Sequence, residues 1–182
     1  MIAEGVYHVT TRGNQRQMIY LSDLDREFFV RLLRKVVREC GWRLFAYTLM
    51  DNHYHLLVQT PDPNIATGLH QLNFTYARHF NGAHGLTGHL FEKRYASVVV
   101  EEDDHFLELI RYIALNPVRA GMCLRAEAWP WASYPSLVGD LPAPDFLDLE
   151  RSLTMFASVQ DLRAFVDSAL KPLRVPGAHV LA

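Results

Sequence analysis

The chain has 182 residues, 49% of them hydrophobic and 21% charged, with a formal net charge of −2, which is typical of an ordinary globular protein and excludes a disordered or uniformly basic chain. No apolar run approaches the roughly 18 residues that cross a membrane, and the N-terminal stretch lacks the basic and apolar regions of a signal peptide. Two cysteines, Cys40 and Cys123, predict neither a disulfide framework nor a zinc site, so a cytoplasmic setting is expected.

The first third of the chain predicts three strands and one helix. Residues 5–13 alternate in polarity at their start, which is typical of a strand. Residues 22–41 combine a capping serine or aspartate, acids in the first turn and a helical apolar stripe, and predict a helix that ends at Gly41. Residues 42–50 and 53–60 predict two further strands. Because only two residues separate them, we expect an antiparallel hairpin.

The middle of the chain predicts two helices and one strand. Residues 64–85 predict a helix with Asn64 as its cap, and residues 88–100 predict a fourth strand. Residues 101–117 predict a third helix, which is expected to stop before Pro117 because proline disfavours helical backbone in the preceding residue.

The order of elements through residue 117 is β-α-β-β-α-β-α, which predicts an α+β fold: an antiparallel sheet with helices gathered on one face, in a ferredoxin-like arrangement. The domain is expected to cover residues 1–135, because Trp129 and Trp131 predict that their segment packs on the core. Residues 136–182 are expected to form a helical C-terminal extension, with a helical pair over 145–170 and a frayed end.

The third predicted strand starts with two histidines. His53 and His55 are two positions apart, so on a strand both point to one face, whereas Tyr54, Leu56 and Val58 point to the other and are expected to be core. Two imidazoles in this arrangement can bind one divalent metal if another element supplies a third ligand. The pattern by itself fits two partly exposed histidines without a ligand equally well.

The helix predicted over 101–117 carries two polar residues away from its apolar stripe. Tyr112 lies about 200° around the helix from Ile110, and Asn116 is one turn further along the same face as Tyr112. This spacing holds a phenol and an amide oxygen side by side. On spacing alone, an exposed tyrosine and an asparagine that caps the helix are the favoured interpretation.

An H-x-H strand followed about sixty residues later by Y-x-x-x-N on a helix resembles the single-tyrosine HUH transposases (Y1 type, IS200-like), and among them most of all the REP-associated tyrosine transposases. That family has a small α+β domain on an antiparallel sheet, in agreement with the predicted order of elements. The matching stretches follow the family's order over roughly residues 5–135: "YHVTTRGN" (7–14), "MDNHYHLLVQ" (50–59), "YARHFN" (76–81), "GHLFEKRY" (88–95), "RYIALNPVRAG" (111–121) and "WPWASY" (129–134).

The resemblance implies that His53 and His55 are metal ligands, Tyr112 the nucleophile and Asn116 the third ligand. The residue between the histidines is usually apolar in the family and is Tyr54 here, and the amide is often glutamine rather than asparagine. The implied activity is metal-dependent cleavage and rejoining of hairpin-bearing single-stranded DNA through a 5′-phosphotyrosine intermediate. A non-cutting DNA-hairpin-binding protein derived from such a transposase is the alternative.

The chemistry explains why these residue types belong together. A tyrosine has an ordinary pKa near 10, so a phenolate nucleophile needs help at neutral pH. A divalent ion on neutral ligands keeps its full charge for the phosphate, and mixed nitrogen and oxygen ligands fit Mg²⁺ or Mn²⁺. A zinc hydrolase is the rival interpretation, but it gives Tyr112 no role. Whether the protein is a monomer or a homodimer is left open.

Basic residues are expected to contact DNA although the whole chain is slightly acidic. Residues 1–100 hold 11 lysines and arginines against 8 acids, whereas residues 101–182 hold 7 against 12, so DNA is expected to avoid the C-terminal part. Arg111, beside the predicted nucleophile, is expected to join the contacts. The main residues expected to neutralise phosphates of single-stranded or hairpin DNA are Arg12, Arg16, Arg78, Lys93, Arg94 and Arg119.

Overall fold

A four-stranded antiparallel sheet is the centre of the computed structural model, which describes residues 3–170. The end of the predicted extension, residues 171–182, lies outside the described residues. The strands lie in the order β2-β3-β1-β4, so the hairpin of β2 and β3 continues through the N-terminal strand to an edge strand. Their bounds are β1 (Gly5–Arg12), β2 (Arg43–Leu49), β3 (His53–Thr60) and β4 (Ala96–Val100).

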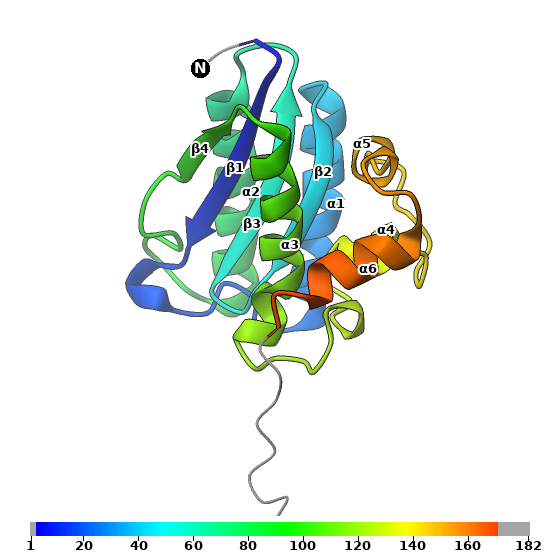
Figure 1. Ribbon diagram of the computed structural model, residues 1–182. Coiled ribbons are helices and arrows are strands. Elements are labelled where there is room, and N and C mark those ends of the chain that lie inside the picture. The colour runs from blue at the N-terminus through cyan, green and yellow to red at the C-terminus, as the bar shows by residue number, and fades with distance from the viewer. Residues whose placement is uncertain (1–2, 171–182) are drawn as a thin grey trace, which may run out of the picture.

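Helices cover both faces of this sheet, so the prediction that they gather on one face is wrong. Figure 1 shows α3 crossing one face, with α1 and α2 behind the other. None of the helices in the described part of the chain is long and apolar enough to span a membrane. The helices are α1 (Asp23–Glu39), α2 (Ile65–His84), α3 (Asp103–Arg119), α4 (Tyr134–Leu137), α5 (Glu150–Thr154) and α6 (Val159–Asp167), with short 3₁₀ turns at Asn14–Arg16 and Ala126–Ala128.

The strand sequences require cover on both faces. On β3, Tyr54 and Leu56 pack against α1 and α2, whereas Leu57 packs against α3. Strand β2 is buried from Leu44 to Leu49 without alternation, which is typical of a strand enclosed on both sides. The sheet therefore separates two apolar cores. One lies between the sheet and helices α1 and α2, and the other, which we call the α3 core, lies between the sheet and α3. His53 and His55 are on the α3 side of the sheet.

Two predicted helix ends differ from the structure. The side chain of Asn64 does not cap α2; instead its oxygen accepts from Trp42 Nε1 (2.7 Å) and its nitrogen donates to the Cys40 carbonyl (3.0 Å). Pro117 lies inside α3, which continues to Arg119. Pro117 is buried, and burial of its ring offsets the hydrogen bond that a proline removes from a helix.

The fourth strand is shorter than predicted, because residues 88–95 form an irregular connecting segment. The carbonyl of Leu90 accepts from the Asn14 backbone (2.8 Å), and the carbonyl of Arg94 accepts from the Asn73 side chain (3.0 Å). These bonds tie the segment to the loop after β1 and to α2. The pairing with β1 continues here through one isolated antiparallel bridge, between Gly13 and Phe91, and not as a regular ladder. Lys93 and Arg94 therefore lie on this segment, and not on a strand as predicted.

The predicted C-terminal helical pair is present as α5 and α6. Leu162 and Val166 of α6 are buried in the α3 core. Asp145 forms ion pairs with Arg34 and Arg38 of α1. Part of the negative charge of the C-terminal region is therefore neutralised by arginines of α1. The domain boundary at residue 135 stays a prediction.

Candidate active site

His53 and His55 lie at the start of β3, on the face that α3 covers. Their ring centroids are 5.0 Å apart with the planes at 83°, so the two imidazoles are neighbours, as their spacing predicts. His55 is buried, and His53 is half-buried at the end of the sheet. The register of the sheet sets Arg12 opposite His53 and Thr10 opposite His55, which fixes what surrounds each ring.

The side chain of Tyr112 extends from α3 toward the histidines of the sheet. Its ring lies edge-on to His55, with centroids 5.4 Å apart, and 39% of the residue is exposed. The helical stripe explains this position, because Ile110 and Ile113 are buried in the core and turn Tyr112 away from it. The guanidinium of Arg119 lies 5.9 Å from the centre of the tyrosine ring. A solvent-accessible phenol, two imidazoles and a cation are thus gathered from two elements that are far apart in sequence.

A third histidine belongs to this group, although the sequence offers it only as a lone candidate with no signal that sets it beside the other two. His8 of β1 stacks on His55 (5.2 Å between centroids) and lies 5.8 Å from the ring of Tyr112. Because alternate residues of a strand share a face, His8 and Thr10 lie on one face of β1. The missing information was the pairing of β1 with β3, which no local pattern encodes.

Each histidine of β3 is bonded through Nδ1. His53 Nδ1 donates to the side-chain oxygen of Asn52 (2.7 Å), and the nitrogen of that amide donates to the Arg16 carbonyl (3.1 Å). His55 Nδ1 lies 3.0 Å from Thr10 Oγ1 and 3.0 Å from His8 Nε2. His55 Nε2 is buried and has no hydrogen-bond partner among the described residues. Six other buried side-chain atoms in the described residues also have no partner, and His55 Nε2 is the one of these seven that belongs to an imidazole, a group that binds metals.

Burial keeps both imidazoles neutral at physiological pH. Desolvation, aided by the charge of Arg12, lowers the pKa of His53 to about 4. Desolvation also lowers the pKa of His55 to about 2, with further contributions from His53 and His8. Because the neutral imidazole is the form that binds metals, this pair is ready to accept an ion at pH 7.

The donor set fits a hard or borderline divalent ion. Within residues 3–170, no group of three or more His, Cys, Asp or Glu side chains is arranged to hold a metal, so two imidazoles need a different third ligand. Asn116, one helical turn after Tyr112 on α3, has an amide oxygen that could serve as this third ligand. Its amide nitrogen donates to the Tyr112 carbonyl (2.9 Å), so its side-chain oxygen is the atom that could bind an ion, and its approach to His53 and His55 stays a prediction. Two imidazoles and an amide oxygen match Mn²⁺ better than a structural zinc site.

Two other tyrosines near the sheet, Tyr76 and Tyr54, are held in the core by hydrogen bonds. Tyr76 is fully buried and donates to the Ile19 carbonyl (2.5 Å), and Tyr54 is fully buried and donates to Asn73 Oδ1 (2.7 Å). Burial raises the pKa of both phenols well above 10. Neither hydroxyl is therefore available as a nucleophile.

Ion pairing separates the basic residues into two groups. The sequence has 18 lysines and arginines, of which Lys171 and Arg174 lie outside the described residues. Ten of the other 16 have a carboxylate within 4.0 Å. Arg111 is one of these, paired with Glu108 and lying over the ring of Phe165, so the expectation that it contacts DNA is not supported. The six without such a partner in residues 3–170 are Arg12, Arg16, Arg78, Lys93, Arg94 and Arg119.

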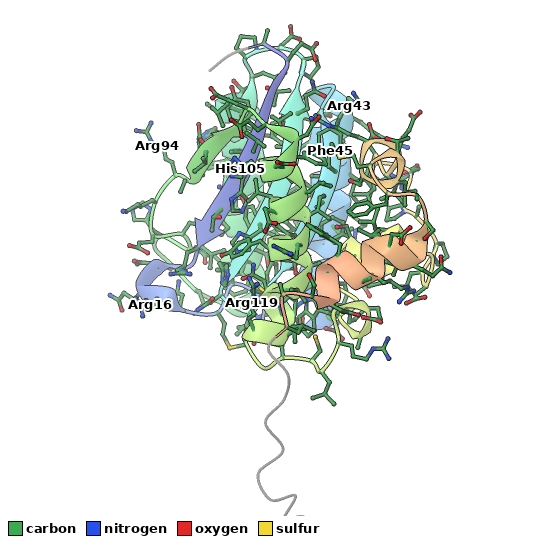
Figure 2. The ribbon with its side chains drawn as sticks, in the orientation of Figure 1. Arg16, Arg43, Phe45, Arg94, His105 and Arg119 are labelled. Atoms are coloured by element: carbon green, nitrogen blue, oxygen red, sulfur yellow. The ribbon has the colours of Figure 1, made fainter. Side chains whose placement is uncertain are left out.

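These six residues occupy two neighbouring regions. Arg78, Lys93 and Arg94 line a pocket of about 1120 Å³ between α2 and the connecting segment 88–95. Of the other three, Arg12 lies opposite His53 in the sheet and Arg119 lies over the ring of Tyr112, whereas Arg16 is joined to the site through its carbonyl, which accepts from Asn52. Figure 2 shows Arg94 and Arg16 projecting from the same side of the molecule, with Arg119 at the lower end of α3. The unpaired charges thus extend from the pocket around the edge of the sheet to the candidate active site.

Comparisons with known proteins agree on one family. The family model described as "Transposase IS200 like" matches residues 2–116. A Haemophilus influenzae protein with the provisional name REP-associated tyrosine transposase is 23% identical over 141 residues, which cover 71% of this chain and 80% of that protein. A solved REP-associated tyrosine transposase bound to a REP hairpin superposes with a TM-score of 0.65 and 20% identity, covering 82% of this chain and 91% of the other. The last similarity shows a shared fold.

Proposed function

Because the chain belongs to the IS200-like transposase family, we propose that it cuts and rejoins DNA strands through a covalent intermediate on Tyr112. The observation that carries the proposal is the meeting of an exposed tyrosine with two neutral histidines, one of which has a buried nitrogen without a partner. A protein that only binds DNA has no need for this combination.

The chemical step forms one bond and breaks one. The oxygen of Tyr112 attacks the phosphorus of a phosphodiester, and the bond from that phosphorus to the 3′ oxygen breaks. The phenol gives up its proton as it attacks, and the leaving 3′ oxygen takes one up, so the products are a 5′-phosphotyrosine ester and a strand that ends in a 3′-OH. The reverse attack by a 3′-OH reseals a strand, so the energy of the broken bond is kept in the ester and no ATP is needed.

The residues proposed to hold a divalent ion are His53 and His55, through their Nε2 atoms, and Asn116 through its amide oxygen. When bound, the ion supplies Lewis-acid polarisation of the scissile phosphate. Arg119 lies beside the phenol ring and adds a positive charge next to the attacking group. His8 and Thr10 contact His55 at Nδ1, the ring nitrogen that would not bind the ion.

The proposed substrate is a hairpin-bearing single strand. The solved relative is bound to a REP hairpin, and the unpaired cations of this chain offer a track for a phosphate backbone. We place the hairpin on the pocket between α2 and segment 88–95. The single-stranded flank would then follow the edge of the sheet past Arg12 and Arg16 to Tyr112.

The experiment is a strand-transfer assay with hairpins that carry randomised single-stranded flanks and Mn²⁺. With a label at the 3′ end of the DNA, we expect the label to move to the protein band in a denaturing gel. With a label at the 5′ end, we expect a shorter free strand. EDTA should prevent both results. A label that joins the protein only from the 5′ end would contradict the proposed polarity, and hairpin binding without any adduct would favour the non-cutting alternative.

A double replacement of Lys93 and Arg94 by alanine tests the proposed DNA surface. We expect hairpin binding to weaken. The slope of log K against log salt is negative, and it should become shallower by about 1.8 if two phosphate contacts are lost. The matched control replaces Arg31 and Lys35 on α1, which also carry two charges but are paired with Glu27 and Glu39. Equal slopes for both double variants would show that segment 88–95 is not part of the DNA surface.

A further inference from the structure

The amide of Asn52 is in contact with two parts of the site at once. Its oxygen accepts from His53 Nδ1 (2.7 Å), and its nitrogen donates to the Arg16 carbonyl (3.1 Å). The second bond fixes which way the amide points, because only its nitrogen can donate to a carbonyl. The oxygen therefore faces His53, and an amide oxygen can only accept. It follows that His53 carries its proton on Nδ1 and has its lone pair on Nε2.

The partners of His55 give the same result for the second ring. Thr10 Oγ1 and His8 Nε2 both lie 3.0 Å from His55 Nδ1, and both can accept a proton from it. The opposite tautomer would bury an N–H at Nε2 without an acceptor, because that atom has no partner among the described residues. A buried donor without an acceptor is destabilising, whereas a lone pair at the same place can bind an ion.

We propose that Asn52, together with Thr10 and His8, forms an outer layer that locks both histidines as Nδ1–H tautomers and presents their Nε2 atoms to a divalent ion. This inference rests on the proposed function, since that function supplies the ion. In metal sites generally, the second ring nitrogen of a ligand histidine is held by such a partner, and loss of the partner weakens metal affinity 10–100-fold. Asn52 is accordingly a positioning residue that does not itself touch the ion.

Two substitutions separate this role from a purely structural one. Asn52→Asp keeps an acceptor oxygen for His53 but loses the N–H that donates to the Arg16 carbonyl. Asn52→Leu loses both. If Asn52 acts through His53, Mn²⁺ affinity stays near or above the wild-type value in N52D and falls about 10–100-fold in N52L. If Asn52 acts only by holding the loop around Arg16, N52D and N52L lose affinity equally, and the proposal is overturned.

The affinity of each protein for Mn²⁺ is measured by calorimetry and electron paramagnetic resonance without DNA, so no turnover is needed. Gln59→Leu is the matched control, because it removes an amide from the far end of the same strand, where Gln59 bonds to Glu4 and Arg43. Its Mn²⁺ affinity should equal that of the wild type. An N52L variant as tight as Q59L would overturn the inference alone, whereas a wild-type protein that binds no Mn²⁺ would contradict the proposed function as well.

A spectroscopic readout tests the tautomers in the metal-free protein. Long-range ¹H–¹⁵N spectra at pH 7.5 should show the proton of both His53 and His55 on Nδ1. The double variant Thr10→Val with His8→Phe keeps the shape of the strand and the stacked ring but removes both partners of His55. We expect the Nδ1–H signal of His55 to be lost or mixed there while His53 is unchanged. A wild-type spectrum with the proton of either ring on Nε2 would overturn the proposal for that ring.

Discussion

Replacement of Tyr112 by phenylalanine is expected to abolish the covalent protein–DNA adduct while leaving the fold and hairpin binding nearly unchanged. The substitution removes one hydroxyl from a residue that is 39% exposed, so no buried hydrogen bond is lost. The phenyl ring can keep its edge-on contacts with His8 and His55. Without the oxygen no ester can form, and the adduct should fall below detection rather than to a fraction of the wild-type amount.

The control is the matching change at Tyr76. Tyr76→Phe leaves the Ile19 carbonyl without its donor in the core, which should cost about 1–3 kcal/mol in the free energy of unfolding. The adduct should nevertheless form, because the Tyr76 hydroxyl is buried on the opposite side of the sheet from the histidines. An adduct that persists in Y112F and disappears in a folded Y76F would disprove the assignment of the nucleophile. Gel detection of the 3′-labelled strand and thermal melting together distinguish these outcomes.

Features that depend on one element could be predicted from the sequence. Strand periodicity is enough to set His53 and His55 on one face, and helical periodicity is enough to turn Tyr112 away from the core beside Ile110 and Ile113. The direction in which each of these side chains points follows from spacing alone, whereas the contact of Tyr112 with His55 depends on α3 covering that face of the sheet. Their roles came from the resemblance to a family, and the metal and the nucleophile remain proposals.

Features that depend on contacts between distant segments could not be predicted. His8 reaches His55 only because β1 pairs with β3 in one particular register, and 47 positions separate the two residues. The second apolar core was missed because β2 gives only a continuous apolar run, which fits a strand covered on both faces as well as other buried elements. The irregular path of residues 88–95 depends on bonds to Asn14 and Asn73, which their own sequence does not reveal.

Arg26 is such a long-range feature, and it connects the "WPWASY" stretch to the turn that carries the histidines. Its side chain is 10% exposed and pairs with Asp51 at 2.6 Å. Its guanidinium lies over the rings of Tyr20, Trp129 and Trp131 at 5.4, 5.8 and 5.9 Å from their centres. Asp51 begins the turn before His53, and its carbonyl also accepts from the Ile19 backbone (2.8 Å). Through its ion pair with Asp51, Arg26 therefore fixes the turn that leads into β3.

Arg26→Ala is expected to lower the free energy of unfolding by about 2–4 kcal/mol. Breaking a fully buried ion pair typically costs 3–5 kcal/mol, but Asp51 is 47% exposed and can be hydrated when its partner is lost. The loss of packing between three aromatic rings adds to the effect. For a chain of this size, each kcal/mol corresponds to a change in melting temperature of about 2–4 °C, so a decrease of roughly 5–15 °C should be seen by calorimetry.

The control for Arg26 is Arg31→Ala on the same helix. Arg31 is also paired, with Glu27 at 3.8 Å, but both side chains are more than half exposed, so the loss should stay below about 1 kcal/mol. Arg26→Lys should fall between the two, because lysine keeps the charge for Asp51 but lacks the planar group that stacks on the rings. If R26A and R31A melt at the same temperature, the buried arginine contributes no more than a surface charge, and the anchoring of the histidine turn must come from the backbone bonds of Asp51 and Asn52 instead.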